Sequence, residues 1–145
     1  MVGAVTLRLS DGVLAEIRRQ GERAYPAECC GVLVGRTGEL KEVLRVIPVM
    51  NRRTDDPHRY LISPDDLQRA DAEVRSASLE VLGFYHSHPD HPAAPSAFDV
   101  EHAWPWYSYV IVRVDPGGAA EVTSWQLADD RSAMNPESLE AFSEV

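Results

Sequence analysis

Two short apolar runs, residues 29–34 and 81–85, constrain the fold of this chain more than any other feature. Each run is a nearly unbroken series of apolar residues, which is typical of a strand buried on both faces in the middle of a sheet. Polar segments with helix-start signals separate the two runs. This succession of strands and helices predicts an α/β protein built around a mixed sheet.

The periodicity of apolar residues predicts the elements outside these runs. Leu7 and Leu9 indicate a short opening strand, and Ser10 or Asp11 can cap a helix that ends before Pro26. The other expected elements are helices that begin after Ser63 and after Ser96, strands at 41–50, 60–62, 107–114 and 120–127, turns at 35–38 and 115–118, a loop at 51–58 and a short terminal helix at 136–142.

The chain has the size of one domain. Its 145 residues, 1–145, are enough to bury a core without disulfides or metal. Hairpins at both ends and helices in the middle predict a mixed sheet with helices on both faces. In such sheets, sites gather at the carboxyl ends of central strands, and two histidines directly follow the run 81–85.

The composition excludes several classes of partner. A formal net charge of −9 repels phosphate groups, which argues against nucleic acid and anionic membranes. No apolar run is long enough to span a membrane. The N-terminal residues do not form a basic start followed by a long apolar stretch, so we expect no secretory signal and a cytoplasmic protein. The oligomeric state does not follow from the sequence.

The residues after the second apolar run form the pattern His86-x-His88 followed by Ser96-x-x-Asp99. In an extended segment, His86 and His88 point to the same face because side chains alternate along a strand. Two imidazoles and one carboxylate are the protein ligands of an open zinc site, which leaves a coordination position for water. The histidine pair alone is a weak signal in a chain with five histidines, whereas the complete pattern rarely arises by chance.

Ser96 and Asp99 also fit a second interpretation, a capping box at a helix start. The two histidines favour metal ligation for Asp99. For Ser96 both interpretations stay open, because one hydroxyl can accept a hydrogen bond from a backbone N–H and donate its own proton to a substrate oxygen.

A hydrolase built on such a site needs a carboxylate that carries protons. Glu28 is the best candidate because it stands just before the buried run 29–34, where a charge is costly unless it is paired or used. An exposed glutamate at the start of a strand is the alternative. His91 and His102 lie near the pattern, and a surface position is the simpler interpretation of both.

Together these residues resemble the pattern of JAMM (MPN-plus) metalloproteases: Glu28 followed by Cys30-Gly31, then His86-Ser87-His88-Pro89, then Ser96-x-x-Asp99. The similarity runs from about residue 5 to about residue 128. It implies that His86, His88 and Asp99 bind Zn²⁺ and a water, that Glu28 is the general acid/base and that Ser96 stabilises the oxyanion. It also implies a cytidine-deaminase-like three-layer α/β/α sandwich.

Members of this family cleave peptide or isopeptide bonds after the C-terminal Gly-Gly of ubiquitin or ubiquitin-like proteins. This short chain resembles the compact prokaryotic members, some of which process ubiquitin-like sulfur-carrier proteins. The resemblance therefore implies a zinc metallopeptidase, an isopeptidase that acts at the Gly-Gly tail of a ubiquitin-like or sulfur-carrier protein. A non-catalytic MPN-type scaffold for protein interactions is the alternative, although a scaffold does not need this ligand set. A nucleobase deaminase would need His-x-Glu and Pro-Cys-x-x-Cys, which the sequence does not contain.

Overall fold

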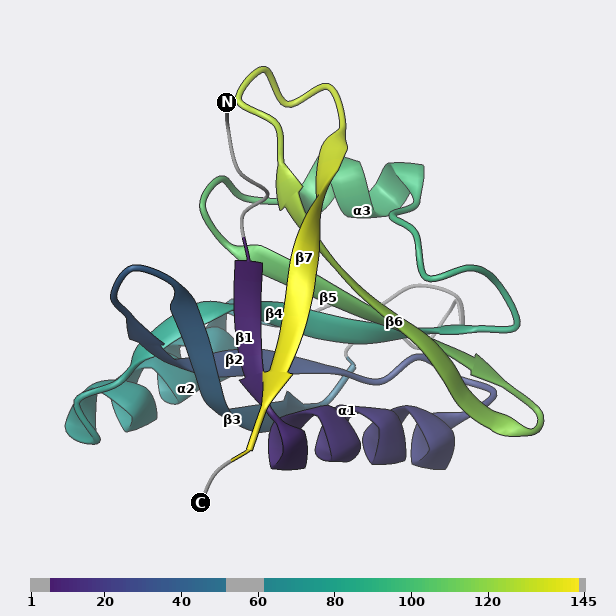
Figure 1. The fold of residues 1–145 in the computed structure, drawn as a ribbon, viewed down its shortest axis with the longest axis horizontal. Helices are drawn as coiled ribbons and strands as arrows, with labels where there is room; N and C mark the ends of the chain where they lie inside the picture. The colour runs from purple at the N-terminus through teal and green to yellow at the C-terminus, as the bar shows by residue number, and fades with distance from the viewer. Residues whose placement is uncertain (1–5, 52–61, 144–145) are drawn as a thin grey trace.

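A computed structural model describes residues 6–51 and 62–143, and these residues form seven strands and three helices (Figure 1). Along the chain the elements are β1 (Thr6–Ser10), α1 (Asp11–Ala24), β2 (Cys30–Thr37), β3 (Lys41–Val49), α2 (Pro64–Ser76), β4 (Glu80–Pro89), α3 (Ala97–His102), β5 (Ser108–Asp115), β6 (Gly118–Leu127) and β7 (Met134–Phe142).

The sheet is mixed, as the sequence predicts. Its strand order is β1-β3-β2-β4-β5-β6-β7, and β4 and β5, the central pair, are parallel. β1 pairs with β3 on one side and with β7 on the other, so the strands close on themselves. The expected three-layer sandwich is therefore not confirmed, because a closed set of strands is not a single layer between two layers of helices.

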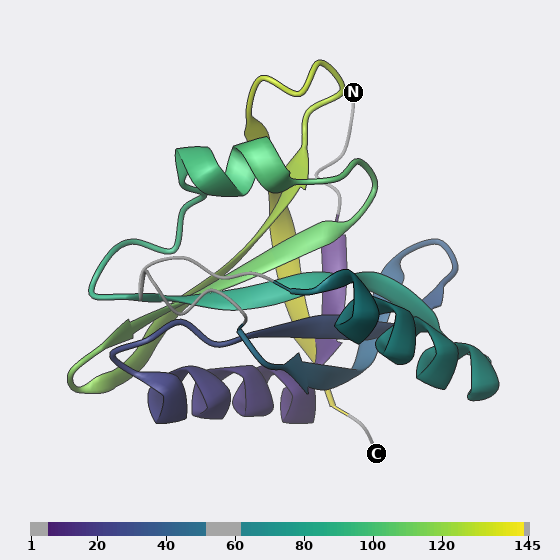
Figure 2. The same ribbon diagram turned by 180° about the vertical axis from the view of Figure 1, so that it is seen from behind.

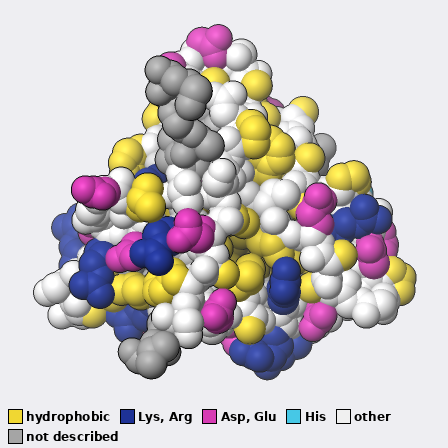
Figure 3. Space-filling view, in the orientation of Figure 1, with side chains coloured by type: hydrophobic (Ala, Val, Ile, Leu, Met, Phe, Trp, Pro, Cys, Tyr) yellow, Lys and Arg dark blue, Asp and Glu magenta, His cyan; other side chains and the backbone are white. Residues whose placement is uncertain are grey.

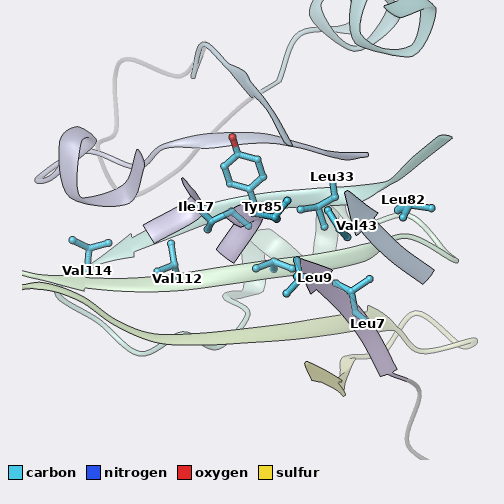
Figure 4. Packing of buried hydrophobic residues seen from close by; sticks show 11 residues of the cluster. Leu7, Leu9, Ile17, Leu33, Val43, Leu82, Tyr85, Val112 and Val114 are labelled. Carbon is cyan, nitrogen blue, oxygen red and sulfur yellow. The ribbon is translucent and has the colours of Figure 1, made fainter. Parts of the chain in front are cut away.

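Helices do cover both faces of β2 and β4, as predicted. Val13 and Ile17 of α1 belong to the same buried cluster as Leu33 and Tyr85, part of which is shown in Figure 4. On the opposite face, α2 packs against Val32, Val34 and Phe84 through the side chains of Ala70 and Val74. Strands covered on both faces are apolar at successive positions, which explains the two runs in the sequence.

Serine caps start the helices where the sequence places them. Ser10 rather than Asp11 is the N-cap of α1, since its side chain accepts a hydrogen bond from the Val13 N–H. Ser63 caps α2 in the same way. In both views of Figures 1 and 2, α1 lies below β2 and β4, and α3 lies above β4 and β5, level with the upper ends of β6 and β7. Among the described residues, no helix combines the length and the apolar character that crossing a bilayer requires.

The predicted terminal helix at 136–142 is wrong. These residues belong to β7, which pairs antiparallel with β6 and parallel with β1. A segment between two strand edges gains backbone hydrogen bonds on both sides, and this gain outweighs the local preference for a helix. The alternation of buried Met134 and Glu137 with exposed neighbours is too irregular to reveal the strand from sequence alone.

The turn predicted at 35–38 is also wrong in part, because β2 continues to Thr37. Gly35 lies at a bulge in β2, where a Cβ atom would stand 1.8 Å from the carbonyl oxygen of Glu42 on β3. The glycine therefore permits a close approach of two strands rather than a turn.

Two further predictions fall mostly outside the described residues. These are the loop predicted at 51–58 and residues 60–61 of the strand predicted at 60–62. Ile62 is described, and it belongs to no strand.

The charge of the molecule is not concentrated on the face seen in Figure 3. Acidic and basic side chains alternate there with apolar groups. The acidic residues behind the net charge of −9 therefore do not form a single acidic patch on this face.

Candidate active site

The two histidines of the pattern lie in the C-terminal half of β4. His86 pairs with Cys30 of β2 and with Ile111 of β5, so its strand is held on both sides. His86 and His88 share one face of β4, whereas Ser87 points to the other. Both rings are almost completely buried, with exposed fractions of 1% and 3%. The prediction that the pair sits near the end of a central strand is confirmed.

Asp99 meets the two histidines although it lies in another element, α3. Its Oδ2 atom is 3.4 Å from His86 Nε2 and 3.3 Å from His88 Nε2, and the two Nε2 atoms are 3.1 Å apart. A metal ion bound tetrahedrally at about 2.0–2.1 Å separates its ligand atoms by roughly 3.3–3.4 Å. The three atoms are therefore spaced as three ligands of one such ion would be, and this donor set fits a divalent metal.

The orientation of His88 supports this fit. Its Nδ1 atom lies 2.8 Å from the Pro92 carbonyl oxygen. A carbonyl only accepts hydrogen bonds, so Nδ1 carries a proton, and Nε2 is the ring nitrogen that remains to bind a metal ion. Backbone carbonyls commonly orient metal-binding histidines in this way.

The capping box predicted at Ser96 and Asp99 exists together with the histidine contacts. The Asp99 N–H donates to Ser96 Oγ over 3.1 Å, and the Ser96 N–H donates to Asp99 Oδ2 over 2.9 Å. The same Oδ2 atom thus faces the helix start and the histidines. The two interpretations of Asp99 are compatible, because the cap holds the carboxylate in the position from which it reaches both rings.

The proline-rich loop between β4 and α3 is fastened to β6. The Thr123 hydroxyl donates to the Ala93 carbonyl oxygen over 2.5 Å, and the Ala93 N–H donates to Glu121 Oε1 over 3.4 Å. These bonds hold the returning loop beside the sheet. They explain how α3 folds back over the histidines.

Glu28 lies beside the histidines, as predicted. It is buried, with 4% of its surface exposed. Three atoms lie within 4.8 Å of one another: a carboxylate oxygen of Glu28, a ring nitrogen of His86 and a ring nitrogen of His88. The Asn51 side chain donates to the Glu28 carbonyl oxygen over 3.3 Å. The alternative of an exposed glutamate is therefore wrong.

Burial and the Asp99 contacts determine the charge states at neutral pH. Burial lowers the pKa of His86, and the hydrogen bond to Asp99 opposes this shift only in part. Burial raises the pKa of Asp99, but hydrogen bonds with His86 and His88 outweigh it and hold that pKa well below its usual range. A neutral imidazole beside an ionised carboxylate is the state that metal binding requires.

The surface position expected for His102 is confirmed, because its side chain is exposed, whereas His91 is half-buried; both lie near the site. The His91 ring packs on the His88 ring with centroids 4.2 Å apart. His102 Nδ1 donates to the Phe98 carbonyl oxygen over 2.9 Å, and the ring lines the cavity beside Asp99. Neither histidine belongs to the group of closely spaced donor atoms.

An apolar cavity of about 190 Å³ adjoins Asp99. Four aromatic side chains from β4, α3, β5 and the segment after α3 dominate its wall, and Trp104 among them is 64% exposed. The residues that line the cavity are Ile62, Leu67, Phe84, Phe98, Asp99, His102, Trp104 and Tyr109.

Sequence reasoning missed three residues around the site. Ser87 is fully buried and accepts a hydrogen bond from the Cys29 N–H through its Oγ atom over 2.9 Å. The Tyr25 hydroxyl donates to Asp90, with 2.7 and 2.9 Å to the two carboxylate oxygens. The position of Ser87 between the histidines was an available signal. No sequence signal indicates the contact between Tyr25 and Asp90, because the two residues lie 65 positions apart in the chain.

Residues 10–128 match the family model described as prokaryotic homologues of the JAB domain. Among curated relatives, a desampylase of Haloferax volcanii is 34% identical over 116 residues, which cover 79% of this chain and 81% of that protein. A probable TtuB-protein conjugate cleaving protease of Thermus thermophilus is 36% identical over 111 residues, or 77% and 72% of the two chains.

A solved structure has the same fold. The solution structure of protein DSY2949 from Desulfitobacterium hafniense superposes with a TM-score of 0.84 at 30% identity, covering 96% of this chain and 94% of that one. The similarity therefore includes β7, which lies beyond the residues that match the family model.

Proposed function

We propose that this chain, which belongs to the prokaryotic homologues of the JAB domain, is a zinc-dependent isopeptidase. These homologues are the compact prokaryotic JAMM type that the sequence motif resembles. Its substrate in this proposal is a small ubiquitin-like or sulfur-carrier protein joined through its C-terminal Gly-Gly to another protein. The names of the two curated relatives, a desampylase and a protease that cleaves TtuB conjugates, support this substrate class. The single observation that carries the proposal is the convergence of His86, His88, Asp99 and Glu28.

The proposed metal ligands are His86 Nε2, His88 Nε2 and Asp99 Oδ2. Two nitrogens and one carboxylate oxygen suit zinc better than magnesium or calcium, which prefer oxygen ligands alone. When bound, the metal would supply Lewis-acid polarisation of the scissile carbonyl and a water with a lowered pKa.

Glu28 is the proposed proton carrier. Its carboxylate accepts a proton from the attacking water while the water oxygen bonds to the carbonyl carbon. The same carboxylate then gives that proton to the leaving nitrogen as the C–N bond breaks. The proximity of Glu28 to both rings and its burial support this role, because a carboxylate shielded from bulk water does not exchange its proton freely with solvent.

Ser96 is the proposed donor to the developing oxyanion. Its Oγ atom accepts from the Asp99 N–H, so the hydroxyl proton remains available to a substrate oxygen. The side chain is exposed, which leaves it accessible from solvent. A preorganised donor of this kind stabilises the charge that forms in the transition state.

The apolar cavity beside Asp99 is the proposed site for an apolar side chain of the substrate tail. Its aromatic lining suits aliphatic side chains, and Asp99 connects it to the ligand cluster. Glycine residues at the end of a tail contribute no side chains, so affinity has to come from residues further back. The cavity provides the surface for such a contact.

Hydrolysis of an isopeptide conjugate tests the proposal. We expect purified protein to release the ubiquitin-like protein, a chelator to abolish release and added zinc to restore it. Glu28→Gln should retain the metal and lose about a thousandfold in kcat, because only the proton carrier is removed. Glu39→Gln, at an exposed position of the β2–β3 turn, is the matched control and should leave kcat unchanged.

Two results would contradict the proposal. An undiminished kcat in Glu28→Gln would exclude the assigned proton carrier. A protein that neither binds zinc nor releases the ubiquitin-like protein would favour the non-catalytic scaffold.

A further inference from the structure

Glu28 occupies a connection that has no regular structure of its own. It lies between α1 and β2, two residues before the first residue of the strand. Strand pairing therefore does not fix its backbone. A proton carrier works only if its carboxylate stays within reach of the water and the leaving group, so contacts on both sides of Glu28 have to position it.

The contact on the C-terminal side is a pair of hydrogen bonds to β4. The Cys29 N–H donates to Ser87 Oγ over 2.9 Å, and the Ser87 N–H donates to the Cys29 carbonyl oxygen over 3.1 Å. Ser87 stands between the two histidines. This pair fixes one end of the connection to the strand that bears the proposed ligands.

The contact on the N-terminal side is the hydrogen bond from Tyr25 to Asp90, which we call the Tyr25–Asp90 link. Tyr25 is held by α1, since its N–H donates to the Gly21 carbonyl oxygen over 3.1 Å. Asp90 comes two residues after His88 and is held by β5, since its N–H donates to the Val114 carbonyl oxygen over 2.8 Å. The link therefore joins two points that are each fixed to regular structure.

We infer that the Tyr25–Asp90 link positions Glu28 against the histidine pair. It acts together with the Cys29–Ser87 pair, so the connection is tied to the histidine segment at both ends. Tyr25 and Asp90 are positioning residues and touch no reacting atom. The inference rests on the proposed role of Glu28, and it adds that this role depends on a contact outside the motif.

Removal of the link should affect turnover and not metal binding. Tyr25→Phe deletes only the hydroxyl, and we expect kcat to fall about tenfold with KM and zinc affinity unchanged, because a carboxylate displaced by a fraction of an ångström transfers protons less efficiently. Asp90→Ala should cost at least as much, because Asp90 also has a φ of 61°, a conformation that aspartate and asparagine adopt more readily than alanine. Asp90→Asn, which keeps an oxygen acceptor, should recover most of the loss. The double variant Tyr25→Phe/Asp90→Ala should be no slower than Asp90→Ala alone.

A measurement without turnover separates this inference from the proposed function. Amide hydrogen exchange at Ala27 and Cys29 should be faster in Tyr25→Phe than in the unaltered protein, because both amides belong to the connection. The control is Thr37→Val, which deletes a hydroxyl that donates to Glu80 over 2.8 Å at the opposite end of β2. It should change neither kcat nor exchange at these two amides.

The outcomes distinguish the two claims. If the unaltered protein hydrolyses no conjugate, the proposed function fails, and exchange at Ala27 and Cys29 alone decides whether the link positions the connection. If the unaltered protein is active and Tyr25→Phe retains full kcat, the link does not position Glu28. Unchanged exchange at both amides, or additive losses in the double variant, would also overturn the inference.

Discussion

At the scale of single residues, Asp99 shows how one side chain serves two purposes. Its Oδ2 atom accepts from the Ser96 N–H and lies 3.3–3.4 Å from both histidine rings. A helix cap needs only an acceptor, whereas a carboxylate ligand also contributes negative charge that attracts the metal ion. The two purposes can therefore be separated by a substitution that keeps the acceptor and removes the charge.

Asp99→Asn should weaken zinc binding by more than about a hundredfold, which exceeds the loss typical of a partner outside the coordination sphere. The metal-free protein should lose no more than about 1 kcal/mol of stability, because the asparagine oxygen still accepts from the Ser96 N–H. Competition with a chromogenic chelator measures the affinity, and urea unfolding without metal measures the stability. Equal zinc affinity in both proteins would show that Asp99 is only a cap.

At the scale of elements, the C-terminal segment shows where local pattern fails. The sequence pattern predicts a helix at 136–142, and the structure has the strand β7 between β1 and β6. The Leu139 side chain packs against the core cluster of α1 and β1, whereas Ala141 is exposed. The hydrogen bonds that stabilise this segment as a strand come from β1 and β6. Because β1 is distant in sequence, the local pattern of the segment does not predict this pairing.

Ala141→Thr tests the strand. Threonine is favoured over alanine in strands and disfavoured in helices, so we expect a gain of about 0.5 kcal/mol in unfolding free energy. The control is Ala15→Thr, the same change at an exposed position of α1, where we expect a loss of about 0.5 kcal/mol. Chemical denaturation of both variants gives the comparison. Losses of equal size at both positions would indicate that residue 141 is helical.

At the scale of the whole molecule, the closed strands place a second buried polar cluster away from the histidines. Glu137 of β7 accepts from the Ser124 hydroxyl over 2.7 Å, and Lys41 of β3 donates to the Trp106 carbonyl oxygen and, over 3.3 Å, to Ser108 Oγ. Burial raises the pKa of Glu137 and lowers that of Lys41. These groups come from four strands and the loop before β5, so only closure of the sheet brings them together.

Glu137→Gln should stabilise the protein near neutral pH by about 1 kcal/mol, since burial disfavours the ionised carboxylate by more than Lys41 and Ser124 favour it, and glutamine is neutral and can still accept from Ser124. Lys41 keeps its bonds to Trp106 and Ser108. Because the pKa of Glu137 is raised in the folded state, its contribution to stability is present below the unfolded value of 4.5 and is lost as the pH rises through the folded value. The advantage of the glutamine variant should therefore disappear below about pH 4.5. Thermal unfolding across this range measures it, and a constant difference at all pH values would contradict the assignment to Glu137.

The sequence by itself determined the central strands, the capped helices and the candidate site residues. These features depend on local patterns: unbroken apolar runs for strands buried on both faces, serine caps for α1 and α2, and chemically distinctive side chains at fixed spacing in the site. Family membership rests on the same pattern and on the match over residues 10–128.

Only the tertiary structure decided the closure of the sheet, the strand at the C-terminus and the contacts that hold Glu28 in place. Each depends on groups that are distant in sequence: β1 with β7, β6 with β7, and Tyr25 with Asp90. Backbone hydrogen bonds between strands are available to almost any residue, and a tyrosine or an aspartate on a connection has many possible partners. Tertiary packing determines which of these partners a residue contacts, so a local sequence pattern does not predict the contact.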